Sequence, residues 1–348
     1  MKEKNTRIEW VDICKAIAII FVFLGHWGTL HLRPFAFAFH LKLFFLISGF
    51  FAATATEKYT FKDFITKKVK QIIIPMILWM WIGIIITNFD TETNLSTILY
   101  QLKDIRNIYP NYWFFPAIFW ISILYYIAKK FYKKNIRVLL FTYLLLLFFG
   151  KTPIIEITLP NWFIFNYLDI KAIFAYAFWF ALGANIFPLI KSFIENKDNS
   201  KKNQNTFHTL GLSATLISSF LFLNDIERIN IVQNHIINNN ILATHYYIIT
   251  SIIIIISVIY FSTFLTNIEF LQKIGKNTMS LMGLEFITRT LITVYLSRLI
   301  GIELILDTTI QVIVMVIIQL TVDMWIIKYI NQSFPILNGE WKTKKIDS

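Results

Sequence analysis

Three ionisable residues lie in one apolar segment near the N-terminus, where they could bind an anion and move a proton. Lys15 and His26 are separated by ten residues, which is close to three helical turns, so their side chains face the same way about 16 Å apart along the axis. Asp12 precedes Lys15 by one turn and can pair with it. Ammonium groups pair well with phosphate, and an imidazole exchanges protons near neutral pH. Alternatively, Asp12 and Lys15 mark a membrane interface and His26 bonds a neighbouring helix.

A second imidazole, His40, lies in the next apolar segment beyond a short turn that contains Arg33 and Pro34. Because the chain reverses there, His26 and His40 should lie at comparable depth on adjacent antiparallel helices. Two such imidazoles can share a proton or bind one substrate hydroxyl. The small pair Ser48-Gly49 further along this segment favours close helix packing over a catalytic serine.

Two further segments carry ionisable residues that a bilayer should not tolerate. Glu285 and Arg289 are one helical turn apart, so one interpretation is an ion pair that makes both residues tolerable in lipid. The other is that Glu285 orients or charges a group from the first two segments, with Arg289 supporting the pocket. Asp323 is also expected inside the bilayer, and the sequence names no partner for it.

These residues need helices that cross a membrane, and the composition supplies them. Hydrophobic residues make up 56% of the 348 residues and charged residues only 16%, with a mean hydropathy of +0.58, which is far from a soluble globular protein. A span needs roughly 20 residues of helix. The sequence predicts an all-α polytopic membrane protein, one domain over residues 1–348, with about ten spans: 10–31, 35–54, 71–89, 112–129, 136–150, 170–190, 207–224, 244–266, 278–299 and 303–330.

Charge distribution predicts the orientation of these spans. Lys and Arg gather at both termini and in every second long loop, which favours a cytoplasmic location for both termini. The net charge of +12 is therefore interpreted as a positive cytoplasmic surface, and no nucleic acid is expected as a partner. The single cysteine, Cys14, excludes a disulfide framework and a multi-cysteine metal site. No metal site and no permanently bound cofactor are expected.

The first two segments resemble the signatures of the family-3 membrane acyltransferases. Asp12 to His26 resembles the opening signature: an Asp, a basic residue, and a His after ten intervening residues. Phe39 to Phe50 resembles the second, a His followed by a Phe pair and Ser-Gly. Further matching stretches follow in order at 67–75, 112–117, 169–183 and 274–280. The chain is most similar to the branch that acetylates cell-surface polysaccharides, with fucose O-acetyltransferase-like and intercellular-adhesin proteins. It departs from the family at Lys42, where Pro is usual, and at Glu285, where His is usual.

The resemblance implies a multi-pass enzyme of a bacterial plasma membrane. Such an enzyme takes an acyl group, most often acetyl, from cytoplasmic acyl-CoA and delivers it to a hydroxyl of a cell-surface or lipid-linked glycan. The partners would then be acyl-CoA as donor, the glycan as acceptor, and membrane lipids.

Roles for individual residues follow from the resemblance. His26 would be the general base or proton relay, His40 would assist or orient the acceptor, and Glu285 would support them. The CoA phosphates would be bound by the basic residues Lys15, Lys67, Lys68 and Lys70, with Asp12 positioning Lys15. Trp113 would line the acceptor side together with Arg289, although a tryptophan of the interfacial belt is an alternative.

Two other classes of function fit the same composition. Ten helices with charged residues near the midplane also describe a transporter or flippase for a glycan or a lipid-linked oligosaccharide. A non-catalytic membrane subunit of a polysaccharide synthesis or export system is the third interpretation.

Overall fold

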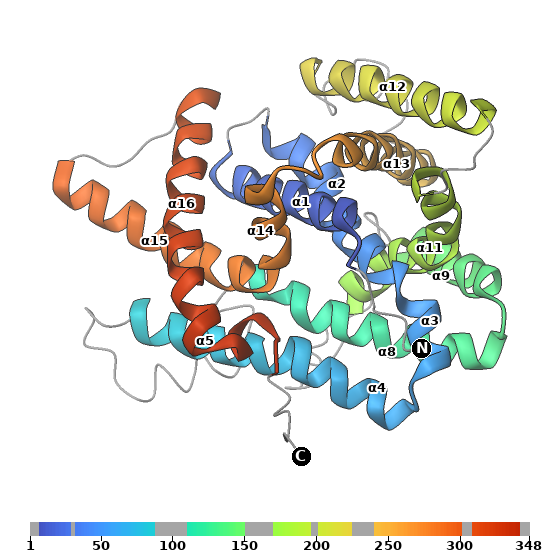
Figure 1. Ribbon diagram of the computed structural model, residues 1–348, viewed down its shortest axis with the longest axis horizontal. Coiled ribbons are helices and arrows are strands. Elements are labelled where there is room, and N and C mark those ends of the chain that lie inside the picture. Colours follow the sequence, from blue (N-terminus) through green and yellow to red (C-terminus); the bar gives the residue numbers. More distant parts are fainter. Residues whose placement is uncertain are drawn as a thin grey trace.

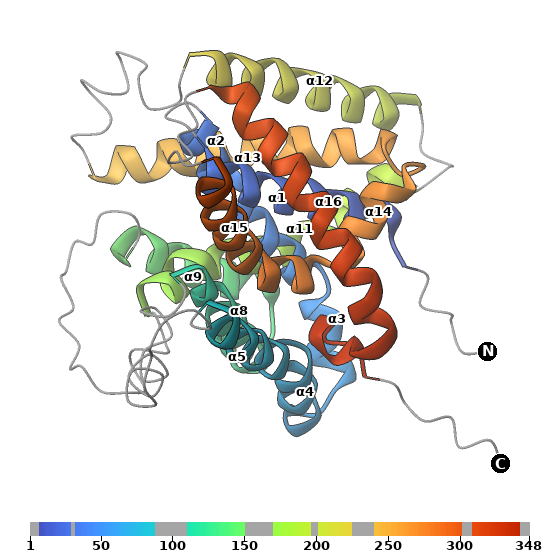
Figure 2. The ribbon, with the colours of Figure 1, turned by 90° about the vertical axis from the view of Figure 1, so that its left-hand side faces the viewer.

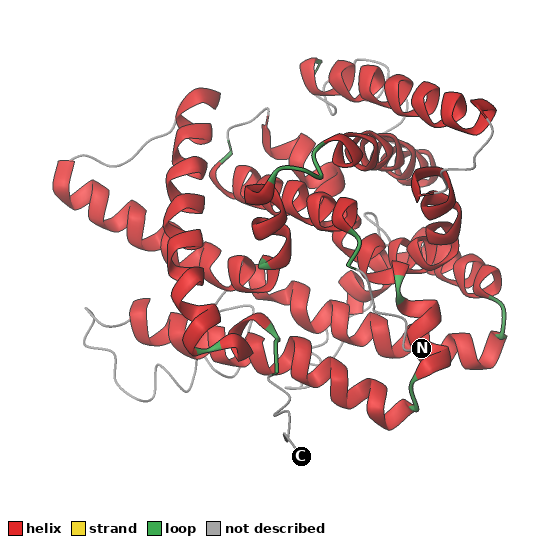
Figure 3. Ribbon diagram, viewed as in Figure 1, coloured by secondary structure: helices red, strands yellow, loops and turns green. Residues whose placement is uncertain are grey.

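The computed structural model describes residues 7–28, 32–87, 110–149, 170–195, 201–224, 240–300 and 308–341, and in these ranges all regular structure is helical (Figure 3). In chain order the elements are α1 (Glu9–Trp27), α2 (Leu32–Phe50), α3 (Ala52–Lys58), α4 (Phe61–Lys68), the π-helical turn η1 (Val69–Ile73), α5 (Ile74–Thr87), the 3₁₀ turn η2 (Pro110–Trp113), α8 (Phe114–Tyr132), α9 (Asn135–Phe149), α11 (Ile170–Glu195), α12 (Lys201–Leu223), α13 (Asn240–Phe264), α14 (Glu269–Lys276), α15 (Thr278–Ile300), α16 (Thr309–Ser333) and the 3₁₀ turn η4 (Pro335–Asn338).

The helices bear out a polytopic all-α membrane protein. Within the described residues, eight helical stretches are long and apolar enough to cross a membrane, and the shorter apolar stretch Asn135–Leu147 lies at the fifth predicted span. Helix α15 covers the ninth predicted span. The number of ten spans and the cytoplasmic placement of both termini stay predictions.

The first and the last predicted spans each differ from the helix at one boundary, for a local reason. The first span was expected over 10–31, but α1 ends at Trp27 because the backbone of Gly28 turns extended, with φ −66° and ψ 144°. The last was expected over 303–330, but α16 begins at Thr309. There the Thr308 hydroxyl accepts a hydrogen bond from the backbone N–H of Gln311, and the side-chain oxygen of Gln311 accepts one from the backbone N–H of Thr308. This capping box satisfies backbone N–H groups that the helix start leaves unpaired.

Helix α1 lies at the centre of the bundle (Figure 1), where it contacts α2, α13, α14, α15 and α16. Ile13, Ala16, Ala18 and Ile19 are completely buried in these contacts. At the start of α1 the approach of α14 is especially close: a Cβ atom on Gly275 would lie 1.9 Å from the Asp12 carbonyl oxygen. Only glycine fits there, so the helix that carries Asp12, Lys15 and His26 is enclosed on several sides.

Helices α2 and α11 also meet through glycine. A Cβ on Gly49 would lie 1.9 Å from the Phe180 carbonyl oxygen, and one on Gly183 would lie 2.0 Å from that of Leu46. The packing role expected for Ser48-Gly49 is thus observed at Gly49. By contrast, α12 lies at the edge against α13 (Figures 1 and 2), and its outward residues Leu216 and Leu223 are 72% and 80% exposed, as suits a helix that faces lipid.

Candidate active site

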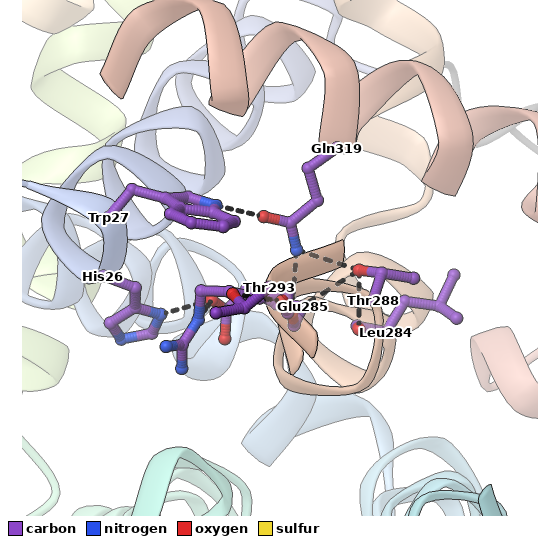
Figure 4. A network of polar contacts seen from close by, with 8 residues as sticks. His26, Trp27, Leu284, Glu285, Thr288, Thr293 and Gln319 are labelled. Atoms are coloured by element: carbon purple, nitrogen blue, oxygen red, sulfur yellow. Dashed lines mark hydrogen bonds and ion pairs between the residues drawn. The ribbon is translucent and has the colours of Figure 1, made fainter. Parts of the chain in front are cut away.

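The last turn of α1 brings an imidazole against a buried carboxylate of α15. His26 Nδ1 lies 2.9 Å from Glu285 Oε1, and Arg289 Nε donates to the same oxygen at 2.8 Å (Figure 4). The Glu285 side chain is only 2% exposed, whereas those of His26 and Arg289 are 16% and 26% exposed. The structure therefore joins the two interpretations of Glu285: it pairs with Arg289 one turn away, and it also meets the imidazole of the first span.

A second set of polar contacts surrounds this pair and was not foreseen. Trp27, which follows His26, donates its indole N–H to Gln319 Oε1 at 2.5 Å. Gln319 Nε2 in turn donates to the Glu285 carbonyl oxygen at 2.7 Å and to Thr288 Oγ1 at 2.8 Å. Helices α1, α15 and α16 are thus bonded together where His26 meets Glu285 (Figure 4).

The opposite end of α1 carries another buried carboxylate. Asp12 is 2% exposed and accepts from Lys15 Nζ at 3.3 Å, the pair that the spacing predicts. Arg7 adds two contacts, from Nε at 2.5 Å and from Nη2 at 3.3 Å. Because Arg7 and Lys15 are both partly exposed, this end presents two cations held by one carboxylate.

His40 is placed differently from the expectation. It is 1% exposed, and its Nδ1 hydrogen-bonds the Ala36 carbonyl one turn earlier. The Phe37 ring lies 5.1 Å from the imidazole of His40 and 6.4 Å from that of His26, measured between ring centroids. In the part of the chain that the structure describes, no hydrogen bond joins the two imidazoles, so direct proton sharing is not observed. A buried ring inside a helix finds its nearest acceptor in its own backbone.

Comparison with family models supplies the class of the protein. The acyltransferase domain of the family-3 acyltransferases matches residues 8–327, a range that contains Asp12 with Lys15 and Glu285 with His26 and Arg289. The chain belongs to this acyltransferase family. Comparison with curated proteins and with solved structures finds no significant match.

The other lysines that were predicted to bind the CoA phosphates lie against aromatic rings. Lys67 donates to the Tyr59 hydroxyl at 3.0 Å and lies 4.5 Å from that ring, and this bond lowers the pKa of the Tyr59 phenol. Lys68 lies 5.6 Å from the Phe64 ring, and Lys70 lies 5.2 Å from that of Trp341. The aromatic ring attracts the cation over its face, so the ammonium group is positioned without an acidic partner that would neutralise its charge.

The segment around Trp113 is tied to the helix of the carboxylate. The Trp113 ring lies 5.5 Å from that of Tyr176 on α11, and it is half-buried. Its neighbour Tyr112 is buried and donates its hydroxyl to the Gly283 carbonyl at 2.8 Å, two residues before Glu285. Tyr112 thus bonds this segment to α15, but no described contact joins Trp113 to His26 or Arg289, and its place at the site stays a prediction.

Two other intramembrane ionisable residues lie outside this pair. Lys42, at the position where the family usually has Pro, donates to the Ala38 carbonyl and to Ser251 Oγ, both at 2.8 Å, and so links α2 to α13. Asp323 is completely buried, as the sequence predicts, and neither of its carboxylate oxygens has a hydrogen-bond partner among the described residues. No group of three or more His, Cys, Asp or Glu side chains that could hold a metal ion occurs in those residues.

Proposed function

We propose that the protein is an O-acyltransferase that moves an acyl group, acetyl in the simplest case, from cytoplasmic acyl-CoA to a hydroxyl of a cell-surface or lipid-linked glycan. The observation that carries this proposal is the contact of 2.9 Å between His26 Nδ1 and the buried carboxylate of Glu285. An imidazole oriented by a carboxylate is the standard arrangement for accepting a proton from a weakly acidic hydroxyl. Membership of an acyltransferase family supplies the reaction class.

The donor would bind at the opposite end of α1. Coenzyme A carries several phosphate charges, and the cations Arg7 and Lys15 are partly exposed beside Asp12. Lys67, Lys68 and Lys70 would add to this positive surface. Lys15 and His26 face the same way about 16 Å apart along the helix, so an extended pantetheine arm can follow α1 from the phosphates towards the imidazole.

The chemical step would take place at the outer end of α1. Nδ1 lies beside Glu285, so a proton on Nδ1 would be stabilised there and Nε2 would be left to accept the proton of the acceptor hydroxyl while the hydroxyl oxygen attacks the thioester carbonyl. As the tetrahedral intermediate collapses, the C–S bond breaks and the CoA sulfur takes that proton from Nε2. Glu285 stabilises the imidazolium that exists between these two transfers, and Arg289 holds the carboxylate.

The acceptor sugar would approach from the side of His40 and Trp113. His40 borders the same Phe37 ring as His26, so it can orient an acceptor without bonding His26. The half-buried Trp113 offers an aromatic face on which a sugar can pack. We place the enzyme in a bacterial cytoplasmic membrane, with an acceptor polysaccharide of the fucose or intercellular-adhesin type.

The test is transfer of radiolabelled acetyl-CoA to a glycan acceptor by the purified protein in lipid nanodiscs. We expect His26→Ala to lower the rate by at least about a hundredfold, a size typical of removing a general base. His208→Ala is the matched control, because His208 lies on α12 and bonds Tyr260 of α13, and it should keep the normal rate. Full activity of His26→Ala would refute the assignment of the base. In sealed proteoliposomes, a wild-type protein that carries labelled glycan across the membrane without acylating it would favour the transporter.

A further inference from the structure

We propose that Gln319 is a positioning residue, which holds the end of α1 against α15 so that His26 and Glu285 stay in contact. The proposal rests on the proposed function for its kinetic consequences. It concerns a residue of α16 that sequence reasoning did not single out and that touches neither imidazole nor carboxylate. Its evidence is the set of bonds that this side chain makes with the immediate neighbours of the pair.

Gln319 bonds both helices of the pair at the point where they meet. Its Oε1 accepts from the indole of Trp27, the residue directly after His26. Its Nε2 donates to the backbone carbonyl of Glu285 itself and to Thr288 Oγ1. One amide therefore joins the backbone of one member of the pair to the chain neighbour of the other (Figure 4).

The orientation of this amide is fixed by its partners. An indole nitrogen is only a donor and a backbone carbonyl is only an acceptor. A flipped amide would set its NH₂ against the Trp27 N–H and its oxygen against the Glu285 carbonyl, so both contacts would become repulsive. Glutamine is thus the residue type that satisfies both partners. A glutamate would set a second anion beside Glu285, and a shorter asparagine would have to span the same gap with one methylene fewer.

Burial makes these bonds matter. Gln319 is completely buried and Trp27 is half-buried, so water does not replace the partners of the amide when the bonds are lost. Helix α1 ends at Trp27, and beyond it the chain is not helical at Gly28. The Trp27 bond to Gln319 therefore anchors the terminal turn that carries His26. Without it, that turn has less to hold the imidazole at 2.9 Å from the carboxylate.

The kinetic test uses variants that remove the bonds. Gln319→Met has a similar length and no hydrogen-bonding amide, and Trp27→Phe removes the indole donor together with the second ring of the indole. We expect Gln319→Met to lower kcat by about ten- to a hundredfold, as a displacement of about 1 Å at a catalytic group does, with the KM for acetyl-CoA within about twofold of normal. Trp27→Phe should lower kcat less. The double variant should be no slower than Gln319→Met alone, because both changes remove the same bond.

A measurement without turnover separates this inference from the proposed function. The chain has six histidines, so selective ¹⁵N-histidine labelling and comparison with His26→Ala assign the His26 ring signals. In the wild type we expect a proton held on Nδ1, facing Glu285. In Gln319→Met that signal should shift towards a mixture of the two tautomers. The control is Gln272→Met on α14, whose side chain bonds the Thr266 carbonyl and which should leave kcat and the His26 signals unchanged.

The outcomes are distinct. A wild type that holds Nδ1–H at His26 but transfers no acyl group would refute the proposed function and leave the positioning role supported by the spectra. Unchanged His26 signals and unchanged kcat in Gln319→Met would overturn the positioning role. A double variant whose loss in kcat equals the product of the two single losses would overturn it as well. If Gln319→Met does not fold, Trp27→Phe decides alone: a normal kcat together with normal His26 signals would overturn the proposal.

Discussion

The two ends of α1 each hold a buried carboxylate between two basic groups, but they are built in different ways. At the N-terminal end Asp12 meets Arg7 and Lys15, both within five residues of it. At the other end Glu285 meets Arg289 of its own helix and His26 of a distant helix. The first cluster needs only one helix and the residues before it, whereas the second exists only when α1, α15 and α16 are packed.

This difference fits the two functions proposed for the ends of α1. A local cluster of partly exposed cations can bind a mobile anionic donor without precise packing, because charge attraction tolerates small displacements. Proton transfer does not tolerate them, since its efficiency falls steeply with misplacement. Changes at the packed end should therefore affect kcat, and changes at the local end should affect the KM for the donor.

The largest effect is expected for Glu285→Gln. The amide keeps the size of the side chain but removes the negative charge that faces His26 and Arg289. We expect kcat to fall by about a hundredfold or more, because the imidazolium loses its stabilising charge. Initial rates at saturating acetyl-CoA measure this. A raised KM with normal kcat would show that Glu285 belongs to donor binding and would erase the contrast between the two ends.

The next effect is expected for Lys15→Met at the local end. The substitution keeps the apolar stem and removes the cation beside Asp12. We expect the KM for acetyl-CoA to rise about tenfold, with kcat changed less than twofold, because one charge-assisted phosphate contact is lost. Lys273→Met, which removes an exposed lysine paired with Glu269 on α14, is the matched control and should leave both constants unchanged. A fall in kcat alone for Lys15→Met would contradict the assignment.

A smaller effect, on stability, is expected for Gly275→Ala. A Cβ there would lie 1.9 Å from the Asp12 carbonyl oxygen, so α14 must move away from the start of α1. We expect the free energy of unfolding to fall by about 1–3 kcal/mol, the usual cost of overpacking a core. Thermal unfolding in nanodiscs measures it. The remaining folded protein should keep its kcat, and a kcat loss as large as that of Glu285→Gln would show that the two ends are not independent.

The smallest effect is expected for Asp323→Leu. Asp323 is buried as deeply as Asp12 and Glu285, but neither of its oxygens has a hydrogen-bond partner in the described residues. Replacing an uncompensated polar group by an apolar one of similar volume should raise the free energy of unfolding by about 1 kcal/mol. The midpoint of thermal unfolding should then rise by a few degrees. Loss of transfer activity in a stably folded Asp323→Leu protein would instead give Asp323 a part in the reaction.

What the sequence could predict follows the same division between local and distant contacts. Apolar length placed the helices, and the three-residue spacing predicted the pair Asp12–Lys15, because both properties are local. The contact of His26 with Glu285 was left open, since helical spacing says nothing about which helices pack together. Gln319 gave only a weak signal, a polar residue in an apolar span. His40 was expected at the depth of His26, where the two imidazoles can share a proton or bind one hydroxyl, but its Nδ1 bonds its own backbone, a competition that spacing alone does not reveal.

The central claim is that His26 and Glu285 act as one unit, and a double-mutant cycle on kcat tests it most directly. His26→Gln, Glu285→Gln and the double variant would be compared with the wild type in acetyl transfer from acetyl-CoA at saturation. Residues that act as one unit show non-additive effects, so the double variant should be about as slow as the slower single variant. Effects that multiply, giving a double variant slower by the product of the two single losses, would show that the two residues act independently and would contradict the account.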